Sequence, residues 1–170
     1  MGKKKFKKKF DKDGLIASTG ARNEIIYEQA QELYNNRKNK QKLSFDTNDF
    51  DISFVRGLSF EDGVTTLTDF TASIIGEELF FSIKESKKKI LDVLISGGGR
   101  KNKTLLLKIK ENLPLNINLK PIDDYKIDGD FIESQAFAYL AVRSFNKLPI
   151  SFPNTTGCRT SSVGGDLINN

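Results

Sequence analysis

Three consecutive glycines, Gly97, Gly98 and Gly99, stand between a short apolar run and a segment with helical periodicity. Glycine lets the backbone N–H groups of such a turn approach a phosphate closely, and the N-terminus of the following helix carries a partial positive charge. In open α/β sheets, ligands also collect at the carboxyl ends of strands, which is where this turn falls. The pattern predicts a nucleotide-binding turn whose chemistry is the positioning of phosphate groups.

Two more specific phosphate motifs fit the turn only in part. Residues 97–104 match the P-loop pattern G-x-x-x-x-G-K-T, except that Asn102 replaces the second glycine. In that interpretation Lys103 and Thr104 would hold phosphate and magnesium. The dinucleotide pattern G-x-G-x-x-G fails at the same asparagine, and no acidic residue ends the next strand. A turn in which the glycines only permit tight packing is the third interpretation, and it is the default for three glycines alone.

The absence of histidine limits the catalytic chemistry that this chain can perform. The 170 residues include no histidine and one cysteine, Cys158. Ser-His-Asp and Cys-His catalysis are therefore excluded, and zinc sites lose their commonest ligand. A general base must be a carboxylate, lysine, tyrosine or cysteine, which favours chemistry such as phosphoryl transfer.

The net charge of +5 comes from one end of the chain. Residues 1–9 contain six lysines and no acidic residue, while the remainder carries 21 basic and 22 acidic residues. We expect residues 1–12 to form a disordered Lys-rich tail and residues 13–170 to form the folded part. No exposed aromatic pattern typical of an RNA-binding sheet is evident, so no nucleic-acid partner is expected. Binding through the lysine tail is the alternative, and it would depend steeply on salt.

The elements that must position the turn follow from periodicity and from helix-capping residues. Ser59 is a candidate N-cap with Asp62 three residues later, and Gly76 lies inside the helix they begin, where it would permit another element to approach closely. The segments expected, in order, are a helix at 23–36, a polar loop at 35–49, a helix at 60–79, a buried strand at 90–95, a helix at 102–112, a strand at 115–119, a turn at 128–130, a helix at 131–146 with an inward apolar face, and a Ser/Thr/Gly-rich closing segment.

This order predicts an α/β fold with at least partly parallel strands. No apolar run approaches the roughly 20 residues that span a bilayer, and no secretory signal pattern begins the chain. With a single cysteine, we expect a cytoplasmic protein without a membrane partner.

Several ordered motifs between about residues 10 and 170 resemble one enzyme family. They are DKDGLIASTG, SFDTNDFD, GLSFEDGVTTLTDFTASII, DVLISGGGRKNKTLLLKIKENLP, DDYKIDGDFIESQAFAYLAVRS, LPISFPNTTGC and SSVGG. Together they resemble the C-terminal portion of anhydro-N-acetylmuramic acid kinases, which carry GGG-x-x-N-x-x-L after an apolar strand and G-D-x-x-E-A-x-A-F-A at the start of a later helix.

The resemblance implies the C-terminal lobe of a two-lobe actin-like ATPase (ribonuclease H-like) kinase fold. It implies ATP- and Mg²⁺-dependent phosphorylation of 1,6-anhydro-N-acetylmuramic acid to N-acetylmuramic acid 6-phosphate in cell-wall recycling, and a homodimer. By the motif match, Gly97, Gly98, Gly99 and Asn102 would border the nucleotide, and Glu133 would contact the sugar. A carboxylate in the first turn of a helix is stabilised in its ionised form, which suits a role for Glu133 as an acceptor of sugar hydroxyls. The same position also fits ordinary helix electrostatics.

The departures from the family pattern are as informative. The G-M-S-x-D-G phosphate loop and the F-D-T-G-P-G-N segment that carries the catalytic aspartate do not occur in these 170 residues. No catalytic residue and no metal ligand is therefore assigned, and we expect little or no kinase activity from the chain alone. A half-domain that binds nucleotide or a partner without catalysis is the alternative. Smaller departures are Leu43, Thr47, Lys126 and Ser134, where the family commonly has a Lys-Ser pair, arginine, glycine and alanine.

Overall fold

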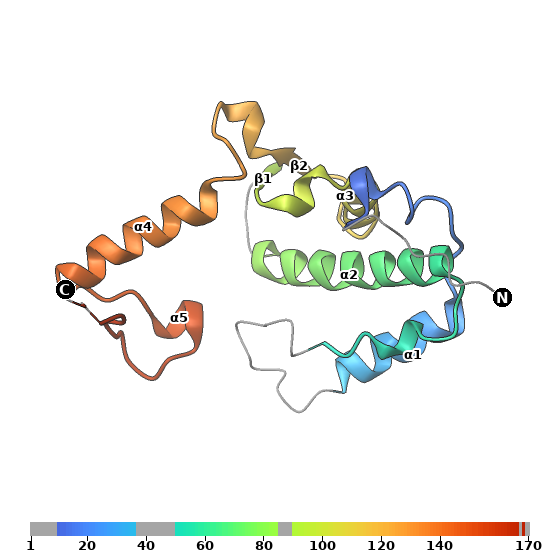
Figure 1. Ribbon diagram of the computed structural model, residues 1–170, viewed down its shortest axis with the longest axis horizontal. Coiled ribbons are helices and arrows are strands. Elements are labelled where there is room, and N and C mark those ends of the chain that lie inside the picture. The colour runs from blue at the N-terminus through green and yellow to red at the C-terminus, as the bar shows by residue number, and fades with distance from the viewer. Residues whose placement is uncertain (1–9, 37–49, 85–89, 167, 169–170) are drawn as a thin grey trace.

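The computed structural model describes residues 10–36, 50–84, 90–166 and 168, and it has an α/β architecture (Figure 1). The predicted α/β class is confirmed. Residues 1–9 of the expected tail and residues 37–49 of the expected loop lie outside the described residues. The described elements are the helices α1 (Glu24–Asn35), α2 (Phe60–Ile83), α3 (Lys103–Glu111), α4 (Ile132–Phe145) and α5 (Pro153–Thr156), the strands β1 (Leu91–Ile95) and β2 (Ile117–Pro121), and short 3-10 turns at Lys12–Gly14, Ser53–Val55, Gly98–Lys101 and Ile122–Tyr125.

Helix α2 is the central element of the described fold. In Figure 1 it runs between α1 on one side and the sheet with α3 on the other. The predicted cap is present, because the Ser59 hydroxyl accepts a hydrogen bond from the Asp62 N–H at 3.1 Å. The Asp62 carboxylate accepts from the Ala21 N–H at 2.8 Å, which fixes the chain before α1. A Cβ on Gly76 would lie 2.6 Å from Cβ of Asn112 at the end of α3, so the predicted close approach at this glycine is confirmed.

Strands β1 and β2 pair in parallel, with Leu91 opposite Ile117 and Ile95 opposite Pro121. Helix α3 makes the crossover between them, as parallel pairing requires. The prediction of parallel strands is therefore confirmed, but β2 begins two residues later than expected. Leu115 is 95% exposed and belongs to the preceding turn, which the Ile117 N–H closes with a 3.1 Å bond to the Pro114 carbonyl.

The prediction that the first strand is buried was wrong for one of its faces. Its side chains alternate between half-buried and exposed, and Leu94 is 47% exposed. Helices cover only one face of the described two-stranded sheet, so only alternate residues are covered. On the open face the Asp92 carboxylate accepts hydrogen bonds from Lys120 Nζ at 2.7 Å and Asn118 Nδ2 at 3.0 Å.

The apolar core lies between α2, α3 and the covered face of the sheet. Its buried members come from these three elements and from the turn after α3, and the half-buried side chains around them complete it. The buried members are Ala72, Ile109, Leu113 and Ile117, surrounded by Ile75, Leu79, Ile83, Val93, Leu105, Leu106 and Leu119. This core positions the glycine turn, because the turn joins β1 to α3 directly.

Helix α4 has the predicted extent but not the predicted packing. The sequence places an apolar face inward, yet no residue of α4 is buried, and Phe137 and Tyr139 are 64% and 62% exposed. In Figure 1, α4 and α5 lie to one side of the other helices. Helical periodicity identifies the apolar face of a helix but not the element that covers it, and in the described residues this face stays largely exposed. Within the closing segment Pro153 begins the short helix α5, consistent with the preference of proline for a first helical turn.

None of the described helices is both long enough and apolar enough to cross a membrane.

Candidate functional site

The glycine turn, defined as Gly97, Gly98 and Gly99, lies at the carboxyl end of β1. Gly97 has φ +75°, a left-handed conformation that favours glycine, and Gly98 begins a 3-10 turn that leads to α3. Gly98 and Gly99 do not have a positive φ, so their backbone conformation does not require glycine. A Cβ on Gly98 would meet no atom within 4 Å, and one on Gly99 would make only an ordinary contact, at 3.8 Å, with Leu105.

Asn102 is the N-cap of α3. Its Oδ1 accepts a hydrogen bond from the Leu105 N–H at 2.9 Å, which explains why the helix begins where the sequence predicts. The neighbouring Thr104 hydroxyl donates to the Gly14 carbonyl at 2.7 Å. A P-loop would need that hydroxyl at the magnesium ion, so its bond to the N-terminal segment weighs against the P-loop interpretation.

Arg100 lies beneath the glycine turn, with only 5% of its side chain exposed. Its guanidinium binds Asp123 with two hydrogen bonds, from Nε at 2.6 Å and from Nη2 at 2.9 Å. Nη1 donates to Asp130 at 2.6 Å and to the Gly97 carbonyl at 2.9 Å. The Gly97 N–H donates to the Gly129 carbonyl at 3.0 Å. These bonds join the glycine turn to the turn after β2 and to the loop before α4.

The charges of this cluster are already paired. Hydrogen bonding from Arg100 lowers the pKa of the Asp123 carboxyl far below its ordinary value, and Arg100 and Lys101 together lower the pKa of Asp130. Because folding lowers both values, the stabilisation is present above the ordinary carboxyl pKa and is lost as the pH falls through the lowered ones. At neutral pH the guanidinium of Arg100 is thus paired with the carboxylates of Asp123 and Asp130, and it has no free nitrogen with which to bind a phosphate.

Glu133 lies in the first turn of α4 and is exposed. The sequence places an acidic residue in that turn, and the structure confirms it. Gly129, whose carbonyl accepts a hydrogen bond from the Gly97 N–H, lies in the loop before α4. Glu133 follows it four residues later in the chain. The structure therefore brings the four predicted nucleotide residues together at one junction and connects that junction to the helix of Glu133.

Sequence reasoning missed the cluster around Arg100. Asp128, Gly129 and Asp130 were interpreted only as a turn, but Gly129 has a steric reason to be glycine. A Cβ there would lie 2.4 Å from Nε of Arg100. Four acidic residues between 123 and 130, more than 20 residues after the Arg-Lys pair that follows the glycines, are the signal that could have suggested this pairing.

A pocket of about 310 Å³ borders the glycine turn on its α3 side. Ser96, Gly99 and Arg100 line it beside apolar residues of α2, α3 and the sheet, among them Leu105. Among the described residues, no group of three or more histidine, cysteine or acidic side chains could hold a metal ion.

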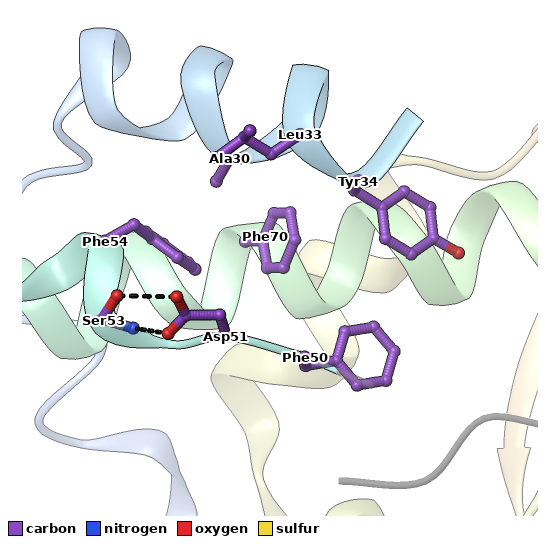
Figure 2. A pocket seen from close by; sticks show the side chains of 8 residues that line it. All are labelled: Ala30, Leu33, Tyr34, Phe50, Asp51, Ser53, Phe54 and Phe70. Atoms are coloured by element: carbon purple, nitrogen blue, oxygen red, sulfur yellow. Dashed lines mark hydrogen bonds between the residues drawn. The ribbon is translucent and has the colours of Figure 1, made fainter. Parts of the chain in front are cut away.

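A second pocket, of about 440 Å³, lies on the other side of α2, between α1 and residues 50–54 (Figure 2). Rings dominate its lining, with Phe54 and Tyr34 each edge-on to Phe70 at centroid distances of 5.1 and 6.2 Å. Its carboxylate, Asp51, accepts two hydrogen bonds from Ser53, from N at 2.8 Å and from Oγ at 2.9 Å. No predicted site residue lies in its lining.

Comparison with known proteins identifies the family. The family model described as anhydro-N-acetylmuramic acid kinase matches residues 2–169. The enzyme of that name from Pelagibacter ubique (strain HTCC1062) is 53% identical over 162 residues, which cover 95% of this chain and 43% of the relative. That from Zymomonas mobilis subsp. mobilis is 38% identical over 93% of this chain and 41% of the relative, and that from Rhizobium rhizogenes is 41% identical over 73% and 32%. The chain thus spans about two fifths of the length of its two longest matches in this group, and it belongs to the anhydro-N-acetylmuramic acid kinase family.

Proposed function

We propose that this chain forms the C-terminal lobe of an actin-like ATPase (ribonuclease H-like) kinase fold and contributes the nucleotide side of a sugar kinase site. The reaction is ATP-dependent phosphorylation of 1,6-anhydro-N-acetylmuramic acid to N-acetylmuramic acid 6-phosphate, in the cytoplasm, during peptidoglycan recycling. The family match over residues 2–169 supports this substrate. The parallel β1–α3–β2 unit with a glycine turn at the carboxyl end of β1 supports the nucleotide role.

The observation that carries the nucleotide role is that a side chain would fit at Gly98, where the space is open, and at Gly99, where a Cβ would make only an ordinary contact. A turn that used its glycines only for packing would fill the space beside each of them, but only Gly97 has a backbone conformation that favours glycine. A ligand that approaches the backbone at the other two positions gives a reason for the missing side chains. The phosphates would be bound by backbone N–H groups of the turn, since Arg100 is already paired.

Glu133 would accept hydrogen bonds from the sugar hydroxyls, as its exposed position in the first turn of α4 allows. The described residues do not fit a protein-held Mg²⁺ site, because no suitable ligand group occurs among them and Arg100 pairs with the acidic side chains nearest the turn. In this proposal Mg²⁺ therefore arrives bound to the phosphates of ATP. The homodimer that the family resemblance implies stays a prediction.

Replacing Gly98 with alanine tests the nucleotide role. The new methyl group meets no atom of the chain, so the free energy of unfolding should change by less than about 0.5 kcal/mol. The methyl group would instead occupy the space that the phosphates approach, and the affinity for Mg-ATP should fall by about tenfold or more. Isothermal titration calorimetry and urea unfolding measure the two quantities.

Gly63→Ala is the matched control, because it adds the same methyl group within α2 at ordinary contact distances of 3.7 Å or more. Its affinity for Mg-ATP should equal that of the unmodified chain. Equal affinities for Gly98→Ala and the unmodified chain, or no binding by the unmodified chain, would contradict the nucleotide role.

A further inference from the structure

Arg100 occupies a position that neither the phosphate motifs nor the family resemblance explains. It follows the glycine turn directly, yet its side chain is only 5% exposed, and all three nitrogen atoms of its guanidinium donate to protein groups. A buried guanidinium costs free energy unless it is paired and hydrogen-bonded, and here its carboxylate partners, Asp123 and Asp130, are themselves 44% and 47% exposed.

The geometry of the bonds indicates what this pairing does. Asp123 belongs to the turn after β2, Asp130 to the loop before α4, and the Gly97 carbonyl to the glycine turn itself. A guanidinium is planar and holds its donors in a fixed fork, so it sets the relative orientation of its partners in a way that the single ammonium of lysine cannot. Three loops that are separate in the sequence are thereby held in one arrangement.

Two further bonds reinforce the same junction. The Gly97 N–H donates to the Gly129 carbonyl at 3.0 Å, and the Gly129 N–H lies 3.4 Å from the Asp123 carboxylate. Gly129 leaves the space that the guanidinium fills, because any Cβ there would overlap Arg100. The loop thus fits around the arginine instead of merely lying near it.

We propose that Arg100 is a positioning residue, which fixes the glycine turn relative to the start of α4 and so sets the nucleotide turn and Glu133 in one arrangement. That a nucleotide and a sugar bind at these positions rests on the proposed function. The bonds that join the glycine turn to the loop before α4 are seen in the structure. Arg100 does not touch the nucleotide in this scheme. It acts through the backbone of Gly97 and through the loop at Gly129.

Arg100→Lys tests the inference, because it keeps the positive charge and removes the fork. Without nucleotide, we expect the amide hydrogens of Gly97 and Gly129 to exchange with solvent about tenfold faster or more, as measured by NMR. The affinity for Mg-ATP should fall by about tenfold, measured at a temperature where urea unfolding shows both proteins to be fully folded.

Arg143→Lys is the control, since it alters a guanidinium that also bonds to a backbone carbonyl, that of Pro149 at 2.8 Å, but away from the turn. In Arg143→Lys, neither the amide exchange at Gly97 and Gly129 nor the affinity for Mg-ATP should change. Asp123→Asn is a second variant, which preserves the shape of the partner and removes its charge. Like Arg100→Lys, it should speed amide exchange at Gly97 and Gly129 and weaken Mg-ATP binding. It replaces Arg100→Lys as the test if that variant does not fold.

The two proposals fail in different ways. If the unmodified chain binds no Mg-ATP, the proposed function fails, while the exchange rates still decide whether Arg100 holds the junction. Unchanged exchange at Gly97 and Gly129 in the folded variants would overturn the positioning role. Faster exchange with an unchanged affinity for Mg-ATP would equally overturn it, because the junction would then be structural only.

Discussion

Replacing Gly14 with alanine should destabilise the fold by about 2–4 kcal/mol. Gly14 has φ +74°, and its carbonyl accepts the Thr104 hydroxyl bond. A Cβ there would lie 2.1 Å from Oδ1 of Asn102 and 2.7 Å from Cβ of Thr104. Backbone strain and steric overlap therefore add, and the overlap falls on the N-cap of α3. Urea unfolding measures the loss.

Gly157→Ala separates the two contributions. Gly157 has a similar φ of +70°, but a Cβ there would meet no atom within 4 Å. It should lose only the strain, about 1–2 kcal/mol. If Gly14→Ala cost no more than Gly157→Ala, the contact between the N-terminal turn and α3 would not contribute to stability.

Ile117→Ala should have a comparable or larger effect, with a loss of about 2–5 kcal/mol in the free energy of unfolding. Ile117 is 2% exposed and packs in the core that joins β2 to α2 and α3. Truncation removes buried apolar contacts and leaves a cavity that the neighbouring side chains fill only in part. Chemical denaturation at equilibrium gives the value.

Leu115→Ala provides the comparison two residues away. Leu115 is 95% exposed, so its truncation should change stability by less than about 0.5 kcal/mol. Similar losses for the two variants would contradict the described burial of Ile117 in the core and the exposure of Leu115 in the turn before β2.

Local structure was the part of the fold that the sequence predicted best. Capping residues explain this success, since Asn23, Ser59 and Asn102 each accept a backbone hydrogen bond at the helix start that the sequence indicates. Such bonds depend on neighbours within a few residues, so they can be inferred without a fold. The burial of β1 and α4 could not be inferred in this way, because it depends on which distant elements cover them.

The site shows the same division between local and distant effects. The four predicted nucleotide residues lie within six positions of the sequence, so their motif can be identified from the sequence alone. They are Gly97, Gly98, Gly99 and Asn102. The pairing of Arg100 across 23 and 30 residues depends on how β2 and the loop before α4 return to the turn. Only the three-dimensional structure shows that the arginine is buried beneath the turn and already paired.

Titration of the ¹⁵N-labelled chain with Mg-ATP, followed by two-dimensional NMR, tests the nucleotide role of the glycine turn most directly. We expect the amide signals of Gly98 and Gly99 to shift most, in a saturable manner, and those of the aromatic pocket at Phe54 and Phe70 not to shift. Saturable shifts confined to residues away from the turn, or no shifts at millimolar Mg-ATP, would contradict it.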